Sequence, residues 1–311
     1  MGTTRRSALM AIGGAAALAA CARAPGKAGG DVVAAGQPAA LLIWAVARER
    51  LAGWPRKPAG RALAALPPRA AALPELGAMA SGGRPANLEA IAALRPRLVI
   101  DYGDIEPEYQ ALAGRMRTRL DIDWRLIDGT LTRIPEAIRE AAALLDADAD
   151  GLATKAAGIL ARWRRAPPGP SFYYARGVEG LETGFRGALA TEVLEGAGWT
   201  NVAVGSRDIG GVAREQVVAW DPEVIVTLSP AFVEAARLDP VWRWRRDNSL
   251  RRILLLPDTP FGWIDRPPSL NRLLGCAWLA GPESSSMEIA MMTRRLYGMA
   301  QVEVARPRWI D

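Results

Sequence analysis

The 311-residue chain contains no histidine and only two cysteines. Histidine is the commonest protein ligand for zinc and the usual general base near neutral pH. Its absence excludes a Ser-His-Asp hydrolase, a zinc metalloprotease and a protein that binds bare zinc through a histidine cluster. Cys21 ends an N-terminal leader and Cys276 lies in an apolar helical stretch. We therefore expect no disulfide to hold the fold together, and an inert buried thiol at Cys276.

Apolar runs of membrane length are also missing. The uncharged stretch at residues 8–20 is too short, because a helix needs roughly 20 apolar residues to span a bilayer. Arg5 and Arg6 precede this stretch and Cys21 follows it. This layout predicts a secretory signal peptide over residues 1–20 rather than a permanent transmembrane helix.

Two export routes and two processing outcomes fit the leader. Arg5 and Arg6 resemble a twin-arginine signal, although Ala8 stands where a bulky Phe is usual, and the general secretory route is the alternative. Residues 18–21 resemble a lipobox, in which Cys21 takes a lipid anchor. Residues 22–24 would instead permit ordinary cleavage and release a soluble protein. We favour lipidation of Cys21, followed by a flexible tether over residues 21–36.

The formal net charge of +6 makes the chain mildly basic. The basic residues are scattered and do not form the stripe of a nucleic-acid-binding surface, so no nucleic-acid partner is expected. A mildly basic protein suits an anionic ligand.

An internal repeat defines the organisation of the mature chain. Residues 88–100 align without a gap on residues 214–226. Each copy predicts a short helix that begins near a glutamate, Glu89 or Glu215, and is stopped by a proline, followed by a buried strand. The chain is therefore expected to form two similar α/β lobes.

Further apolar runs predict the remaining strands and the connection between the lobes. Alternation of strands with helical stretches favours mainly parallel sheets. Residues 134–165 have helical spacing and predict one long linking helix, although Gly151 and the Asp-rich turn before it would be a place to break it. The predicted N-terminal lobe covers residues 37–133, and the C-terminal lobe covers residues 166–311 with a closing helix at 288–297. The predicted strands are 40–47, 124–127, 171–174 and 253–256.

Seven motifs, at residues 87–89, 94–100, 180–184, 192–198, 215–216, 222–225 and 260–273, together span nearly all of the mature chain. Taken in order, they resemble the periplasmic-binding-protein family for iron-siderophore complexes and cobalamin. The resemblance implies an α/β fold of two Rossmann-like lobes with mainly parallel sheets, joined by one long helix. It also implies an extracytoplasmic, non-enzymatic protein without a cofactor of its own. Such a protein captures an iron(III)-siderophore-type metal complex and delivers it to an ABC permease dimer.

In this family one surface glutamate on each lobe docks onto arginines of the permease. The resemblance assigns that role to Glu89 and Glu215, and their equivalent places in the internal repeat agree with it. A carboxylate in the first turn of a helix also favours the helix dipole, by about 0.3 to 1 kcal/mol, which is the alternative role.

Candidate ligand-binding residues follow from the rule that ligands of parallel sheets bind beyond the carboxyl ends of the strands. Aromatic faces suit the rings of a siderophore, and arginine suits its carboxylates or catecholates. A tyrosine would also be able to ligate ferric iron as a phenolate. The rule selects Arg48, Trp54, Tyr102 and Asp128 from the first lobe, and Tyr174, Arg176, Ser229, Thr259, Trp263 and Arg266 from the second.

Other ligands and one other class of function stay open. Molybdate or tungstate would be enclosed by arginines and backbone N–H groups. Haem would need Tyr or Met as its iron ligand, and cobalamin is also possible. An enzyme would use a carboxylate pair, Asp101 with Asp104 or Asp121 with Asp123. Alternate positions on a strand project apart, so solvation explains these pairs more simply.

Substitution of the proposed lipid-bearing residue tests the anchor. Cys21→Ser should abolish membrane association and leave ligand affinity unchanged, because Cys21 precedes the predicted fold. Detergent phase partitioning of the parent and the variant measures this. A variant that enters the detergent phase as fully as the parent would contradict lipidation.

Overall fold

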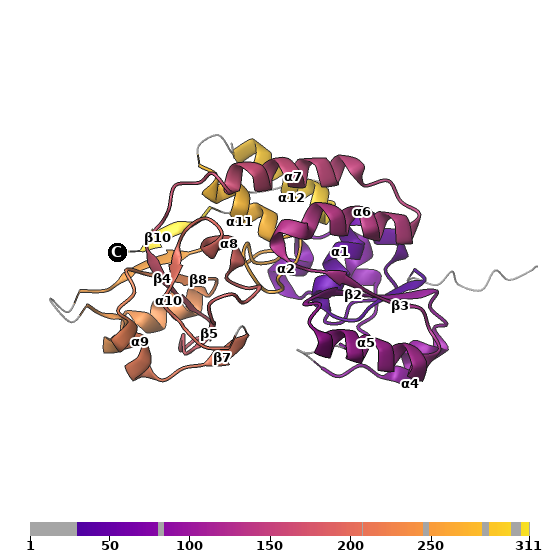
Figure 1. Ribbon diagram of the computed structural model, residues 1–311, viewed down its shortest axis with the longest axis horizontal. Coiled ribbons are helices and arrows are strands. Elements are labelled where there is room, and N and C mark those ends of the chain that lie inside the picture. Colours follow the sequence, from indigo (N-terminus) through magenta and orange to yellow (C-terminus); the bar gives the residue numbers. More distant parts are fainter. Residues whose placement is uncertain are drawn as a thin grey trace, which may run out of the picture.

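The computed structural model of the protein describes residues 30–79, 84–206, 208–244, 249–281, 286–299 and 306–310. Two lobes lie side by side beneath a layer of helices (Figure 1). The predicted signal peptide, Cys21 and most of the predicted tether lie outside the described residues. No described helix combines the length and the apolar character that crossing a bilayer requires.

The first lobe contains a parallel three-stranded sheet in the order β1-β2-β3. Its strands are β1 (Val32–Ala34), β2 (Leu98–Gly103) and β3 (Trp124–Asp128). The helical segments of this lobe are α1 (Gln37–Ala47), η1 (Arg48–Arg50), α2 (Gly60–Ala64), α3 (Pro68–Ala72), α4 (Leu88–Ala93), α5 (Pro107–Leu120) and η2 (Leu131–Arg133).

The prediction of a strand at residues 40–47 is wrong, because this segment belongs to helix α1. Every residue from Ala39 to Ala47 is buried, since α1 packs against β2, α6 and α12. A helix that is apolar on all sides has no polar face and therefore lacks the 3.6-residue periodicity that would identify it. The first strand is β1, which lies within the predicted tether, so the fold begins before residue 37.

The second lobe contains a five-stranded sheet in the order β10-β9-β8-β4-β6, in which only β10 is antiparallel to its neighbour. The strands predicted at 124–127, 171–174 and 253–256 are confirmed as β3, β4 and β9, and the mainly parallel sheets are confirmed too. The strands of this lobe are β4 (Ser171–Ala175), β5 (Glu182–Gly184), β6 (Thr200–Asn201), β7 (Ile209–Gly211), β8 (Val224–Thr227), β9 (Arg252–Leu255) and β10 (Arg308–Ile310). Its helical segments are α8 (Glu192–Glu195), α9 (Arg214–Trp220), α10 (Pro230–Ala236), η3 (Pro240–Trp242), α11 (Arg272–Leu279) and α12 (Ser286–Tyr297).

The internal repeat is confirmed in three dimensions. The first copy forms α4 and β2, and the second forms α9 and β8. The two copies also leave their helices in the same way: Arg95 has φ 47° and the equivalent Asp221 has φ 45°. Left-handed residues end helices, and the proline that follows each of them prevents the helix from continuing.

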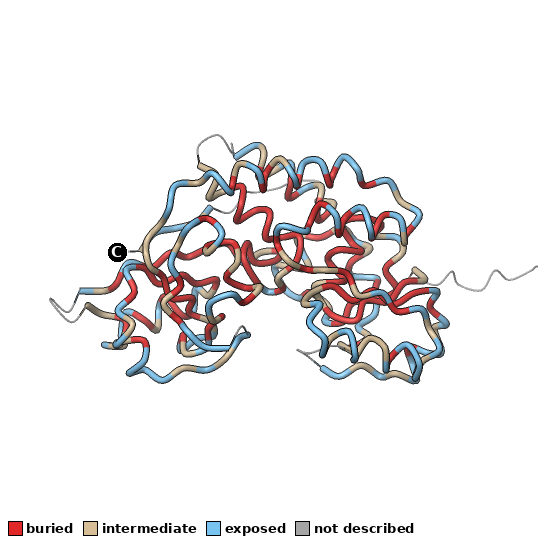
Figure 2. Tube along the Cα trace, in the orientation of Figure 1, coloured by how far each residue is buried: buried red, intermediate tan, exposed pale blue. Residues whose placement is uncertain are grey.

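The connection between the lobes consists of two helices and not the single helix predicted. Helix α6 (Ile134–Leu145) ends at Asp146, whose φ of 52° is left-handed, and α7 (Asp150–Trp163) begins four residues later. The two helices pack on each other, and α7 also packs on α11. Together with α12 they form the layer that covers both lobes (Figure 1). Buried residues follow the two sheets and run beneath this layer from one lobe to the other (Figure 2).

A buried polar cluster joins the lobes below the helical layer. Arg272 is fully buried and donates to the carbonyl oxygen of Gly129 in the first lobe. It also donates to the carboxylate of Glu192, 2.6 Å away, in the second lobe. The backbone N–H of Leu131 donates to the same carboxylate at 3.0 Å. Arg272 and Glu192 thus hold residues 129–131 of one lobe against α8 and α11 of the other.

Removal of one charge from this cluster tests how much the cluster contributes to stability. Glu192→Gln should lower the free energy of unfolding by about 3 kcal/mol, because Arg272 would remain buried without a counter-charge. Urea denaturation of the parent and the variant measures this. Glu140→Gln, on the exposed face of α6, is the control and should change stability by less than about 0.5 kcal/mol. Equal effects of the two changes would mean that the pair does not hold the lobes together.

Candidate ligand-binding cleft

A cavity of about 500 Å³ opens between the two lobes. It lies at the carboxyl end of β2 and at the loop after β1, where parallel sheets place their ligands. In Figure 1 it corresponds to the place where β7 of one lobe faces α5 of the other. The first lobe lines it with Gly36, Pro38, Asp101, Tyr102, Gly103, Asp104 and Tyr109, and the second with Ala188, Leu189, Ala190, Asp208, Ile209 and Pro268.

Asp101 is a buried carboxylate in the wall of this cleft. Only 7 % of the residue is exposed. Its Oδ1 accepts a hydrogen bond from the backbone N–H of Tyr102 at 2.9 Å, and no ion pair balances its charge within the described residues. Burial raises the pKa of Asp101, and the backbone hydrogen bond opposes this only in part.

Two tyrosines lie beside Asp101 in the same wall. The hydroxyl of Tyr102 is buried and has no hydrogen-bond partner of good geometry in the described part of the chain. Burial raises the pKa of Tyr102, while the nearby Arg272 opposes the increase. Tyr109 is half-buried, and burial followed by the carboxylates of Asp208 and Asp104 raises its pKa. Carboxylates of both lobes therefore act on the same phenol.

Of the residues predicted to bind the ligand from the first lobe, Tyr102 lines the cleft. Asp128 is the last residue of β3, the strand that pairs with β2. The Oδ1 of Asp128 accepts a hydrogen bond from the backbone N–H of Thr130 at 2.8 Å. The prediction for Arg48 is wrong, because α1 begins at the cleft and runs away from it. Arg48 lies beyond the far end of α1, with its guanidinium 5.7 Å from the ring centroid of Trp44.

The prediction for Trp54 is also wrong, because its side chain is completely buried. Its Nε1 donates to the carbonyl oxygen of Ala70 at 3.1 Å. Its ring lies 5.1 Å from that of Trp44, measured between centroids. Trp54 is a core residue of the first lobe.

In the second lobe, two of the predicted residues belong to a buried network. Tyr174 is fully buried and donates to Asp265 at 3.0 Å, and Arg176 pairs with Asp265 and Glu182, each at 3.0 Å. Burial and then the charge of Asp265 hold the pKa of Tyr174 well above its usual range. The charge of Asp265 raises the pKa of Arg176 even though burial alone would lower it. These side chains satisfy one another instead of facing a ligand.

The other predicted residues of the second lobe differ in exposure. Trp263 is 3 % exposed and belongs to the main core, so the prediction that it contacts the ligand is wrong. Ser229 caps α10 by accepting the N–H of Phe232 at 3.2 Å. Thr259 donates to Asp258 at 2.9 Å. Arg266 is exposed, and its left-handed φ of 62° is unusual for a residue with a side chain.

The sequence rule missed most of the acidic lining of the cleft. The sequence indicates Asp101 and Asp104 as an enzymatic pair only, although they flank the end of a predicted strand. Asp208 lies just before β7, which pairs with β5 outside the main sheet. No local pattern placed it opposite the first lobe. In the described residues no group of three or more His, Cys, Asp or Glu side chains is arranged to hold a metal ion.

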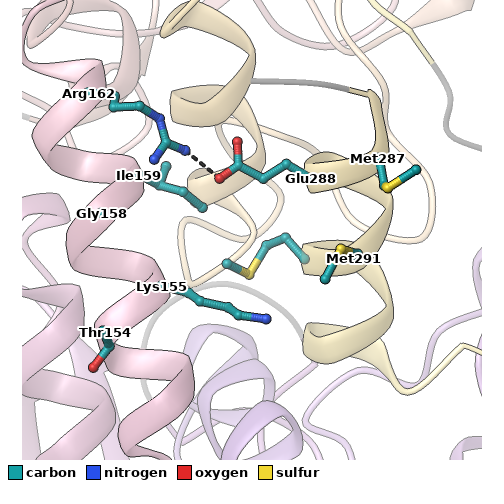
Figure 3. Close-up of a pocket in the computed structure, with 9 residues that line it drawn as sticks. Thr154, Lys155, Gly158, Ile159, Arg162, Met287, Glu288 and Met291 are labelled. Carbon is teal, nitrogen blue, oxygen red and sulfur yellow. Dashed lines mark hydrogen bonds and ion pairs between the residues drawn. The ribbon is translucent and has the colours of Figure 1, made fainter. Parts of the chain in front are cut away.

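A second cavity, of about 640 Å³, lies between α7 and α12. Figure 3 shows Met287 and Met291 on one side and Lys155 on the other, with Arg162 paired to Glu288 across the gap. This cavity belongs to the helical layer and lies away from the carboxyl ends of the strands. The interlobe cleft is therefore the better candidate for the ligand site.

Solved structures with this fold were found by comparison. An ABC transporter solute-binding protein from Sulfurospirillum deleyianum is 24 % identical, with a TM-score of 0.74, and the match covers 88 % of this chain and 91 % of that one. The vitamin B12-binding protein BtuF of Vibrio cholerae is 18 % identical (TM-score 0.60, coverage 85 % and 97 %). The molybdate-binding protein MolA of Haemophilus influenzae is also 18 % identical (TM-score 0.61, coverage 90 % and 95 %).

No protein-family model matches the sequence, and no curated protein matches it either. At these identities the structural likeness establishes the fold. The chain has the two-lobed α/β fold of the periplasmic solute-binding proteins that serve ABC transporters, as the sequence motifs predicted.

Substitution of Trp263 tests whether its ring stabilises the core. Trp263→Ala should lower the free energy of unfolding by about 3 to 5 kcal/mol, because it empties a large part of the core. Trp309→Ala, at a side chain that is 40 % exposed, is the matched control and should cost about 1 kcal/mol or less. Chemical denaturation measures both. A stable Trp263→Ala variant would indicate that this ring serves the ligand and not the core.

Proposed function

We propose that this protein is the substrate-binding component of an ABC importer and captures an iron(III)-siderophore-type metal complex in the interlobe cleft. The observation that carries the proposal is the cavity of about 500 Å³ that both lobes line at the end of a parallel strand. This volume lies within the range of about 300 to 1,000 Å³ that is usual for small-molecule sites. The structural neighbours that are named for solute binding or transport support the same function.

The cleft favours a metal complex over a small oxyanion. A molybdate or tungstate site needs N–H donors or positive side chains, but none of the described residues that line this cleft is Lys or Arg. The cavity is also much larger than a tetrahedral oxyanion requires. Cobalamin is the alternative metal complex. Haem would have to use a phenol such as Tyr102 or Tyr109, because the chain has no histidine.

A carboxylate-dependent enzyme receives less support from the geometry. Asp121 and Asp123 lie at the amino end of β3, whereas the cleft lies at the carboxyl ends of the strands. Asp123 pairs with Arg125 at 3.0 Å. Asp104 accepts the backbone N–H of Glu106 at 2.9 Å and so shapes the loop that it belongs to. Asp121 and Asp123 therefore do not face the cleft, and Asp104 has a role in its own loop.

The same proposal places the protein outside the cytoplasmic membrane, anchored through a lipid on Cys21, with an ABC permease dimer as its partner. The two helices of the internal repeat support the docking role of their glutamates. Helices α4 and α9 lie at the lower edge of the two lobes, on the side where the cleft opens (Figure 1). Glu89 and Glu215 are both exposed in the first turn of these helices.

Both helix starts are held without help from the glutamates. In α4 the side chain of Asn87 accepts the N–H of Ala90 at 3.1 Å. In α9 the side chain of Gln216 accepts the N–H of Ala213 at 2.8 Å, although Ala213 itself cannot cap the helix with its side chain. Glu89 and Glu215 are therefore free to serve a surface role.

Substitution of the two glutamates tests docking. Glu89→Ala and Glu215→Ala should each weaken association with the permease by about 1 kcal/mol or less, because each removes one exposed charge contact. The double change should weaken it further, and raised ionic strength should have the same effect. Transport in vesicles and binding to the purified permease measure this.

Glu136→Ala is the matched control, since Glu136 is also an exposed first-turn glutamate but lies on α6 in the helical layer. It should leave docking unchanged. If all three single variants behave like the parent, Glu89 and Glu215 only favour their helix dipoles. If instead ligand affinity falls while docking survives, they belong to the binding site.

A further inference from the structure

The charged residues that the structure describes in the walls of the cleft are all acidic. Asp101 and Asp104 contribute carboxylates from the first lobe, and Asp208 contributes one from the second. The other described lining residues are tyrosine, glycine, proline or aliphatic. The described lining of the cleft is thus acidic, although the formal net charge of the chain is +6. An acidic lining favours a cationic ligand, whereas the composition suggested an anionic one.

Asp101 is the most informative of these carboxylates. A buried charge without a counter-charge is costly, so natural proteins pair such groups or use them. Asp101 is 7 % exposed, and its carboxylate accepts one hydrogen bond, from a backbone N–H. Asp101 is thus a buried carboxylate in the cavity wall whose charge no described cation balances.

Described carboxylates line the cleft from both lobes. The carboxylates of Asp208 and Asp104 both raise the pKa of Tyr109, beyond the effect of its burial. Asp208 belongs to the opposite lobe, so a ligand between the lobes meets carboxylates on two sides. The acids are nevertheless not grouped closely enough to chelate a bare metal ion.

We infer that the cleft selects a metal complex that presents positive charge and hydrogen-bond donors to Asp101, Asp104 and Asp208. This inference rests on the proposed function and narrows its substrate class. A ferric ion bound by three singly charged hydroxamates is neutral, and a free ammonium group on the same molecule makes the complex a cation. A ferric ion bound by three doubly charged catecholates is an anion, which these carboxylates would repel.

Three ferric complexes test this charge selection. The first is a linear tris-hydroxamate with a free ammonium group, the second is the same complex with that amine acetylated, and the third is a tris-catecholate. Isothermal titration with the parent should show the ammonium form binding about tenfold more tightly than the acetylated form. The catecholate complex should bind more weakly than either.

Variants of the cleft carboxylates identify the source of the preference. Asp104→Asn and Asp208→Asn should each reduce the preference for the ammonium form, while Asp123→Asn, outside the cleft, should retain it. Arg207 is the basic neighbour of Asp208 in the sequence and lies outside the described residues. Arg207→Ala should also retain the preference if the acids decide it.

Asp101→Asn is tested both without ligand, by its melting temperature, and with ligand, by its affinity. Asp101→Asn keeps an oxygen for the N–H of Tyr102 and removes the buried charge, so the unliganded variant should melt at the same temperature as the parent or higher. It should also lose affinity for the ammonium complex. A clear loss of thermal stability with unchanged affinity would show that Asp101 is structural, and would overturn the inference.

The remaining outcomes separate this inference from the proposed function. Tighter binding of the catecholate complex, or failure of both hydroxamate complexes to bind, would overturn the charge selection. If the catecholate complex binds and is transported, the importer proposal stands without it. If no complex of either charge binds and the docking variants also behave like the parent, the proposed function falls as well.

Discussion

The buried guanidinium of Arg272 is the constraint on which the relation of the two lobes depends. A charge removed from water must be matched by nearby acceptors, or it destabilises the fold. Arg272 meets the carboxylate of Glu192, the carbonyl oxygen of Gly129 and the carbonyl oxygen of Ser269. Because these acceptors come from both lobes, the lobes cannot separate at this point without leaving the charge unmatched. The cleft therefore opens below a fixed junction.

The junction also sets the environment of the cleft. The charge of Arg272 opposes the effect of burial on the pKa of Tyr102. Among the described residues no cation acts in this way on Asp101. Arg272 is paired with Glu192 inside the junction, whereas the carboxylates of Asp101, Asp104 and Asp208 line the cavity.

The internal repeat provides two surfaces of the same kind at a fixed separation. Helices α4 and α9 each precede a strand of their lobe's sheet, and both end at a left-handed residue followed by proline. Helices α6 and α7 then hold the lobes together through packing on α1 and α11. The two lobes thus present equivalent helices, each with an exposed glutamate in its first turn.

The sequence by itself determined the features that depend on local pattern: the repeat, the parallel α/β lobes, strands β3, β4 and β9, and the closing helix α12. It also placed Tyr102 at the end of β2, where the residue lines the cavity, because this strand end is visible as the end of an apolar run. It did not identify α1, because a segment buried on every side has no periodicity, and it did not decide that the connection breaks at Asp146. Tertiary structure alone placed Trp54 and Trp263 in the core. The sequence does not distinguish an aromatic side chain that contacts a ligand from one that packs against other side chains. Tertiary structure alone also brought Asp208 opposite Asp101, because these residues come from different lobes and meet only when Arg272 and Glu192 hold the lobes in place.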